Sequence, residues 1–196
     1  MYKKKAFTLA EVLLTLTVVG ILATLTIPAM IQNTQDTELK VAWKQSFLDL
    51  SQASKKLSLD NAGNLSGLFT DNNDFRDHYL PYLSYTKTCN TGTATGLNGC
   101  WPLITYELSG GILVNSTFTD LSRVMLNNGT LLGFYLGSST CTNTETPNND
   151  QCGNIIVDVN GFKGPNKVGK DIFDVSCKAQ RIENVRSCFS PAERNP

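Results

Sequence analysis

This chain contains almost no histidine: His78 is the single one among 196 residues. One imidazole excludes metal sites built from several histidines, and it restricts any Ser-His-acid or Cys-His site to this position. The chain also has no net charge, because 17 Lys and Arg balance 17 Asp and Glu, so its overall field gives no reason to expect a nucleic-acid partner. No glycine-rich loop precedes a helix in the pattern of a phosphate site. We therefore expect no enzyme, and we interpret His78, between Asp77 and Tyr79, as a surface residue.

The Cys-x-x-Cys spacing of zinc and redox sites is missing as well, although the chain has six cysteines. An even number of cysteines outside such spacings indicates disulfides and therefore an oxidising compartment outside the cytoplasm. They form three pairs separated by 11 residues each, which predicts three local bridges: Cys89 with Cys100, Cys141 with Cys152, and Cys177 with Cys188. The third bridge is the least secure, because residues 178–187 have helical spacing and an unbroken helix would hold Cys177 and Cys188 roughly 16 Å apart.

Charge is also missing from the N-terminal run Phe7 to Ile27, where Glu11 is the only ionisable side chain in 21 residues. A helix of that length reaches roughly 30 Å, the thickness of a bilayer core. Lys3 to Lys5 precede the run, which places the N-terminus in the cytoplasm and the rest of the chain across the membrane. From Phe7 onward the chain carries 14 positive and 17 negative residues, a net charge of −3.

Two ordinary interpretations of this run are a cleaved signal peptide, with small residues at Ala23 and Ala29, and a plain single-span anchor. Glu11 favours a third one, because an ionisable group inside a membrane segment is costly and needs a partner. A cut between Ala6 and Phe7 would create an amine one helical turn from Glu11. A neighbouring subunit, shifted along its axis, could offer that amine to the carboxylate.

The segment Lys5 to Glu11, followed by an apolar stretch with Gly20 and Pro28, resembles the class III signal of type IV prepilins and type II secretion pseudopilins. The resemblance implies cleavage after Ala6 by a membrane prepilin peptidase and N-methylation of Phe7. It also implies pairing of Glu11 with a neighbour's N-terminus, and Gly20 and Pro28 match the family's helix-breaking pair. The family usually has Gly before the cut, where this chain has Ala6.

The resemblance further implies a helical filament assembled with other pilin or pseudopilin subunits from an inner-membrane platform, driven by a cytoplasmic ATPase. We accordingly expect a single-pass protein of the bacterial inner membrane, in contact with lipid, whose globular part is extracytoplasmic. Polymerisation through the N-terminal helix is the expected function. The alternative is a membrane-anchored binding domain or adhesin that never polymerises.

The residues after Pro28 predict an α+β fold in which one long helix packs on an antiparallel sheet, the architecture that the resemblance also implies. Apolar residues from Leu39 to Leu57 recur at three- and four-residue steps, so the helix should continue to about Leu59 and stop at Asp60 to Asn64. The expected parts are a leader at 1–6, a membrane and filament-core helix at 7–28, its amphipathic continuation at 29–59 and a β-rich domain at 60–196. Within that domain we expect a helix at 73–80 closed by Pro81, a hairpin over 123–136 turning at Asn128-Gly129, and strands at 103–108, 112–114, 154–159 and 171–176.

The connection between the last two strands has two interpretations. Asp158, Asn160 and Asp171 supply the oxygen ligands that Ca²⁺ prefers, and some pseudopilins bind calcium in a loop of this region. The spacing is not that of an EF-hand, because Gly161 follows at once and no Glu closes a twelve-residue loop. The simpler interpretation is a turn-rich connection bent by Asn160-Gly161 and Gly164-Pro165-Asn166.

Overall fold

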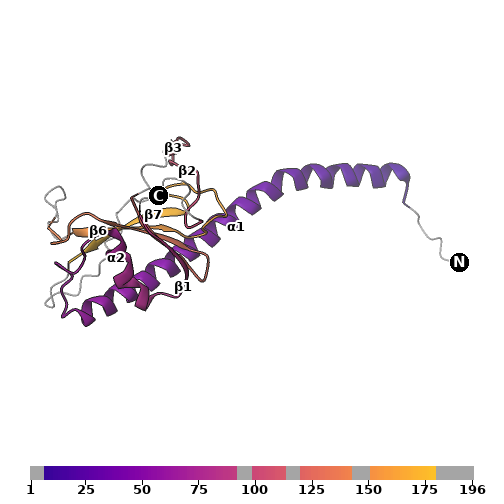
Figure 1. Ribbon diagram of the computed structural model, residues 1–196. Helices are drawn as coiled ribbons and strands as arrows, with labels where there is room; N and C mark the ends of the chain where they lie inside the picture. The colour runs from indigo at the N-terminus through magenta and orange to yellow at the C-terminus, as the bar shows by residue number, and fades with distance from the viewer. Residues whose placement is uncertain (1–6, 92–98, 114–119, 143–150, 180–196) are drawn as a thin grey trace. The chain divides into compact units, whose positions relative to one another are not determined.

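A computed structural model describes residues 7–91, 99–113, 120–142 and 151–179 (Figure 1). The chain divides into two compact units, residues 1–40 and 41–196. Helix α1 (Leu9–Asp60) belongs to both, and each unit is described by itself below. The end of α1 agrees with the helix predicted to about Leu59.

The first unit consists of the N-terminal part of α1, which continues through Pro28 without interruption. Proline has no N–H to give to the carbonyl one turn earlier, so Pro28 removes one backbone hydrogen bond there. Six threonine hydroxyls along this part donate to carbonyls three or four residues earlier, which leaves few hydroxyl groups without a partner on an apolar surface. These are Thr15, Thr17, Thr24, Thr26, Thr34 and Thr37.

The second unit contains a five-stranded sheet in the order β1-β4-β5-β6-β7, in which every neighbouring pair is antiparallel. Its strands are β1 (Tyr85–Cys89), β4 (Ser122–Leu126), β5 (Leu131–Leu136), β6 (Gln151–Asp158) and β7 (Ile172–Lys178). Two short strands, β2 (Thr105–Tyr106) and β3 (Ile112–Leu113), form a separate hairpin. The C-terminal part of α1 and helix α2 (Asn72–Tyr79) lie along one face of the five-stranded sheet (Figure 1).

The predicted apolar stripe of α1 packs into this unit. Leu50, Ala53 and Leu57 are buried, and the Trp43 ring lies 4.4 Å from the ring of Phe173 on β7. Helix α2 adds Phe75 and Tyr79, whose rings meet Phe134 of β5 at 5.4 and 5.5 Å. The Tyr79 hydroxyl also lies 3.0 Å from the Ser54 hydroxyl of α1. A helix packed on an antiparallel sheet is thus present, which confirms the predicted α+β fold.

The opposite face of the sheet is covered by Trp101, which is buried against Leu121, Leu131 and Ile172. Trp101 directly follows Cys100, so the bridge to Cys89 holds the covering segment at β1. The sheet is therefore buried on both faces in this region. This explains why β4 and β5 are nearly continuous runs of buried residues, without a clear alternation.

The strand and turn predictions differ from the structure in four places. β1 was not predicted, because four of its five residues are exposed and its sequence, YTKTC, lacks an apolar face. The strand expected at 103–108 is restricted to Thr105–Tyr106. The second helix ends at Tyr79, one residue before its predicted end, and Pro81 lies within the 3₁₀ turn that follows, Leu80–Tyr82. In the hairpin turn, Gly129 has a φ of 89°, whereas Asn128 does not adopt positive φ and instead accepts a hydrogen bond from Thr130 N.

Two of the three predicted bridges are present, Cys89–Cys100 and Cys141–Cys152, with Cα atoms 6.3 and 3.8 Å apart. The segment after α1 is held to the residues directly before the second bridge, because Gly67 N donates to Ser139 O and the Ser66 hydroxyl donates to Thr140 O. Cys177 is buried on β7, with its sulfur 3.4 Å from the Tyr79 hydroxyl. Its predicted partner, Cys188, lies outside the described residues, so that pairing stays a prediction.

Replacing both Cys141 and Cys152 with Ser should destabilise the second unit by roughly 2–3 kcal/mol, because the bridge restricts the unfolded chain. For a domain of this size the melting temperature should fall by about 5–10 °C. Thermal unfolding of the full chain in detergent measures the effect. Reductant should lower the melting temperature of the unsubstituted chain further than that of the double variant; equal melting temperatures for the oxidised chain and the variant would contradict a stabilising role.

Candidate functional site

The predicted assembly residue Glu11 lies in the first turn of α1 and closes a capping box with Thr8. Its Oε2 accepts hydrogen bonds from Thr8 N at 2.8 Å and from the Thr8 hydroxyl at 2.9 Å, while Glu11 N donates to that hydroxyl at 3.3 Å. Such a box satisfies N–H groups that the first helical turn leaves unpaired. Glu11 therefore has a role within the single chain that the sequence analysis missed, although the Thr-x-x-Glu spacing of a capping box was visible there.

The processing residues lie directly before this cap. Phe7 is 85% exposed, and Ala6 lies outside the described residues, as do the lysines of the leader. Phe7 lies two residues before the first residue of α1, so the expected cleavage position lies at the start of the helix. A new amine on Phe7 would thus lie next to the cap that Glu11 closes.

Gly20 and Pro28 both lie within α1, and the single chain gives no packing reason for the glycine. A Cβ added at Gly20 would meet no atom within 4 Å. Glycine in a helix interior costs roughly 0.5–1 kcal/mol relative to alanine. A role for Gly20 in subunit packing therefore stays a prediction from the resemblance.

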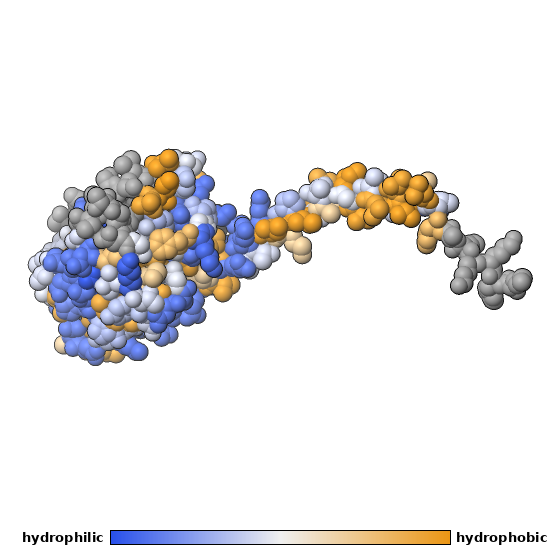
Figure 2. Space-filling view, turned by 45° about the vertical axis from the view of Figure 1, so that its right-hand side comes forward, coloured by the Kyte–Doolittle hydropathy of each residue, from blue (hydrophilic) through white to orange (hydrophobic). Residues whose placement is uncertain are grey.

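Among the described residues, α1 is the helix whose length and composition would allow it to cross a membrane, and the protein buries none of its apolar window. Figure 2 shows this apolar part as a mainly orange surface with paler patches between the orange atoms. Leu9, Leu14, Val19, Leu25 and Met30 are examples of side chains that remain more than half exposed. Such a surface needs a cover, and lipid or the helices of other subunits can provide one.

The loop from Asp158 to Asp171 is held by its two end carboxylates. Asp158 Oδ1 accepts hydrogen bonds from Gly161 N at 2.8 Å and Asn160 N at 3.3 Å. The two oxygens of Asp171 accept from Asn166 N at 2.7 Å and Lys167 N at 2.6 Å. These bonds form the turns of the connection, so the loop has the structural role that the turn interpretation predicts.

The same loop also contains three buried oxygens without a hydrogen-bond partner: Asp158 Oδ2, Asn160 Oδ1 and Asn166 Oδ1. Asp158 and Asp171 are themselves fully buried. Burial, followed by the nearby negative charge of Asp171, raises the pKa of Asp158 to about 7. Buried oxygens of this kind are normally hydrogen-bonded, and an oxygen-only donor set is what Ca²⁺ binds. The loop therefore contains buried oxygens of the kind that Ca²⁺ binds.

Asn166 is a candidate ligand that the sequence analysis placed only in a turn. Its φ of 51° turns the backbone at this position. No group of three or more His, Cys, Asp and Glu side chains suited to a metal occurs in the part of the chain that the structure describes. A cation here would thus depend on the two asparagine amides as well as the carboxylates, which explains why a search for acidic motifs gives so weak a signal.

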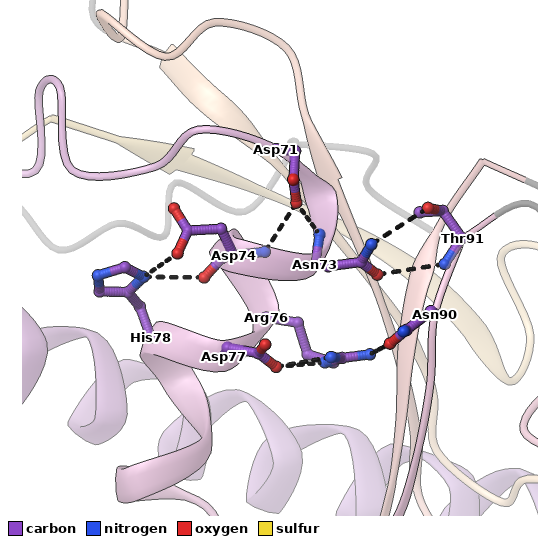
Figure 3. A network of polar contacts seen from close by, with 8 residues as sticks. All are labelled: Asp71, Asn73, Asp74, Arg76, Asp77, His78, Asn90 and Thr91. Carbon is purple, nitrogen blue, oxygen red and sulfur yellow. Dashed lines mark hydrogen bonds and ion pairs between the residues drawn. The ribbon is translucent and has the colours of Figure 1, made fainter.

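His78 belongs to the polar network of helix α2 (Figure 3). Its Nδ1 lies 2.8 Å from the Asp74 carbonyl and 3.2 Å from the Asp74 carboxylate, and its ring meets the edge of Phe69. Asp71 caps the helix by accepting hydrogen bonds from Asn73 N and Asp74 N. These contacts hold the helix itself and give His78 a structural role.

Other members of the network connect α2 to the segment after β1. Arg76 is buried, pairs with Asp77 at 2.6 Å and donates to the Asn90 side chain at 3.0 Å (Figure 3). Asn73 exchanges hydrogen bonds with Thr91 through both atoms of its amide group. Because Asn90 follows Cys89, α2 positions the base of the first bridged loop.

Comparison with known protein families gives a match at the N-terminus. Residues 1–27 match the prokaryotic N-terminal methylation motif. No curated protein and no solved structure matches the chain. The match includes the expected cleavage position at Ala6 and Phe7, the capping carboxylate of Glu11, and the apolar helix that the structure leaves uncovered. The chain therefore carries the class III signal peptide of type IV pilins and pseudopilins.

Proposed function

We propose that this protein is a structural subunit of a type IV pilus or a type II secretion pseudopilus. The observation that carries the proposal is the methylation motif at residues 1–27, placed on an apolar helix that the chain itself does not cover. A subunit that polymerises through this helix buries it against copies of itself, whereas one stored in the membrane buries it in lipid. The same surface therefore serves both states.

In this proposal a prepilin peptidase cuts the chain after Ala6 and the new amine of Phe7 is methylated. The inner-membrane platform and its ATPase then move the subunit from lipid into the filament. Glu11 pairs with the Phe7 amine of a neighbouring subunit while retaining its bond to Thr8, since a carboxylate can accept several hydrogen bonds at once. Apolar surroundings would strengthen the pairing between Glu11 and the Phe7 amine, because charges interact more strongly where water is excluded.

The proposed topology places the N-terminus in the cytoplasm and the second unit outside the inner membrane. The three lysines of the leader support the orientation by the positive-inside rule. The two disulfides of the second unit support an oxidising location. In this assignment the protein acts by assembly and has no enzymatic role.

The alternative function is a membrane-anchored binding domain that never polymerises. It predicts that the N-terminal signal peptide stays uncleaved, or that replacing Glu11 does not change whether the protein is assembled. The N-terminal sequence of the mature protein distinguishes the two, since only the filament subunit begins with a methylated Phe7.

Processing is tested by replacing Ala6 with Leu. A bulky residue before the cut should leave the chain as uncleaved precursor in the membrane, and cleavage should fall by about tenfold or more. Mass spectrometry of the N-terminus measures cleavage and methylation together. Ala6→Gly is the matched control, because it introduces the residue usual in the family and should be cut at least as well; a mature N-terminus of normal abundance in Ala6→Leu would count against the proposal.

We also propose that the loop from Asp158 to Asp171 binds Ca²⁺. The oxygens of Asp158, Asn160 and Asn166 that have no hydrogen-bond partner support it, and Asp171 would add a second negative charge. Bound calcium would supply the positive charge that two buried carboxylates lack. The loop would then be stabilised where β6 passes into β7.

A further inference from the structure

Exposed apolar side chains gather on one surface of the second unit, around the β2–β3 hairpin. Leu103, Leu108 and Ile112 are each more than 60% exposed, and Ile104 and Val168 are also exposed. In Figure 2 the orange atoms at the upper edge of the globular part lie at the height of this hairpin. We call these five residues, together with the adjoining lysines named below, the hairpin surface.

Hydrogen bonds hold this surface as one piece with the loop after β6. Tyr106 N donates to Asn166 O at 2.8 Å, and Val168 N donates to Tyr106 O at 2.9 Å. The side chain of Leu108 lies against Gly169, so close that an added Cβ would be 3.6 Å from it. The apolar residues of the hairpin and of the loop therefore form a continuous surface.

The loop supplies positive charge next to these apolar residues in the chain, because Lys167 precedes Val168 and Lys170 follows Gly169. Lys163, Lys167 and Lys170 follow one another within eight residues, and Lys163 and Lys170 are exposed. The carboxylates of the same two segments are Glu107, which is exposed, and Asp171, which is buried and accepts two backbone hydrogen bonds. The exposed charge on this surface is thus mainly positive, although the chain from Phe7 onward is negative overall.

The covalent path from this surface to the apolar helix is short. The loop leads into Ile172 and Phe173 of β7, and the Phe173 ring stacks on Trp43, near the start of the second unit. Twelve residues separate Trp43 from Ile31, the last residue of the exposed apolar run. This short stretch of chain tethers the second unit to the bilayer that holds the N-terminal part of α1.

We propose that the hairpin surface docks on anionic lipid in the membrane that anchors the subunit before assembly, an inference that rests on the proposed function. Exposed leucine and isoleucine next to lysines are the combination that binds the interface of an anionic bilayer. Short tethering raises the local concentration of lipid at this surface, so weak contacts suffice. Docking would hold the second unit against the membrane until the subunit leaves it for the filament.

The test uses the full chain in lipid nanodiscs, one copy per disc, whose acyl chains carry bromine. Leu108→Trp places an indole on the hairpin surface, and its fluorescence is compared with that of the unsubstituted chain, which contains Trp43 and Trp101. We expect strong quenching of the added indole in discs that contain anionic lipid. Leu59→Trp is the matched control, because Leu59 is 78% exposed at the C-terminal end of α1 and should not be quenched.

Replacing Lys163 and Lys167 with Gln in the Leu108→Trp chain should weaken docking by about fivefold per lysine. Added salt, or discs of zwitterionic lipid alone, should have a similar effect. If the Leu108→Trp chain folds poorly, Ile112→Trp is the second variant for the same measurement. Equal quenching at positions 108 and 59 would overturn the proposal, and so would quenching that does not change when the lysines are replaced. A fluorescence change that appears only with two chains per disc would assign the surface to contact between copies. Filament formation is scored separately, so failed docking in a chain that assembles leaves the proposed function intact.

Discussion

A chain with Glu11→Ala is expected to enter the membrane and to form few or no filaments. Burial of an unpaired carboxylate costs about 2.5–3.5 kcal/mol at helix-centre depth and less in the first turn, where Glu11 lies, so its removal favours insertion by up to that amount. The filament, in contrast, loses a charged contact with the Phe7 amine of the neighbouring subunit. Such a contact is worth about 1.5–3 kcal/mol, which predicts at least about a tenfold loss of assembled subunit. Immunoblots of sheared filaments and of the membrane fraction measure both effects.

Glu11→Gln distinguishes charge pairing from helix capping. The structure shows Glu11 bonded to Thr8 N and to the Thr8 hydroxyl, so alanine removes a cap together with the charge. Glutamine keeps the capping box but carries no charge. We expect Glu11→Gln to fail as Glu11→Ala does. Normal filaments from the glutamine variant alone would assign the residue to capping, and normal filaments from both variants would refute a role in assembly.

In the absence of calcium, the second unit is expected to lose stability as the pH rises from about 4 to about 7. Burial and Asp171 raise the pKa of Asp158 to about 7 in the folded chain, from an ordinary value near 3.8. Between these two values the unfolded chain has released the proton and the folded chain still holds it, so each step up in pH favours unfolding. The full shift corresponds to about 4 kcal/mol at most. Urea unfolding of the full chain, in detergent with a chelator, measures the slope.

Calcium should remove most of this loss, because the cation takes the place of the proton between the carboxylates. At a concentration 100 times its dissociation constant it would add about 2.7 kcal/mol, and the gain should be larger at pH 8 than at pH 5. Asp158→Asn should abolish both the pH slope and the response to calcium. Asp174→Asn, which alters an exposed carboxylate of β7, is the matched control and should change neither. An Asp158→Asn chain with the original pH slope would show that another group titrates, and a calcium response identical in both variants would place the ion elsewhere.

The local patterns of the sequence predicted much of the second unit. The step of three and four residues from Trp43 to Leu57 predicted the buried stripe of α1, and alternating or continuous apolar runs predicted β4 to β7. Two bridges followed from the equal spacing of cysteines. β1 was not predicted because four of its five residues are exposed. Its place at the sheet edge depends on pairing with β4, from Tyr85 opposite Leu126 to Cys89 opposite Arg123.

The amino-acid sequence by itself determined the N-terminal signal, because the chemistry of processing and insertion depends on a short linear order: lysines, Ala6, Phe7, Glu11 and an apolar run. Tertiary structure alone decided which polar groups of the 158–171 loop are buried without a partner, and which apolar side chains form the hairpin surface. Burial depends on contacts between segments far apart in the chain. Leu108 meets Gly169 because β2 pairs with the loop after β6, where Tyr106 N donates to Asn166 O and Val168 N donates to Tyr106 O. No pattern of neighbouring residues records such a contact.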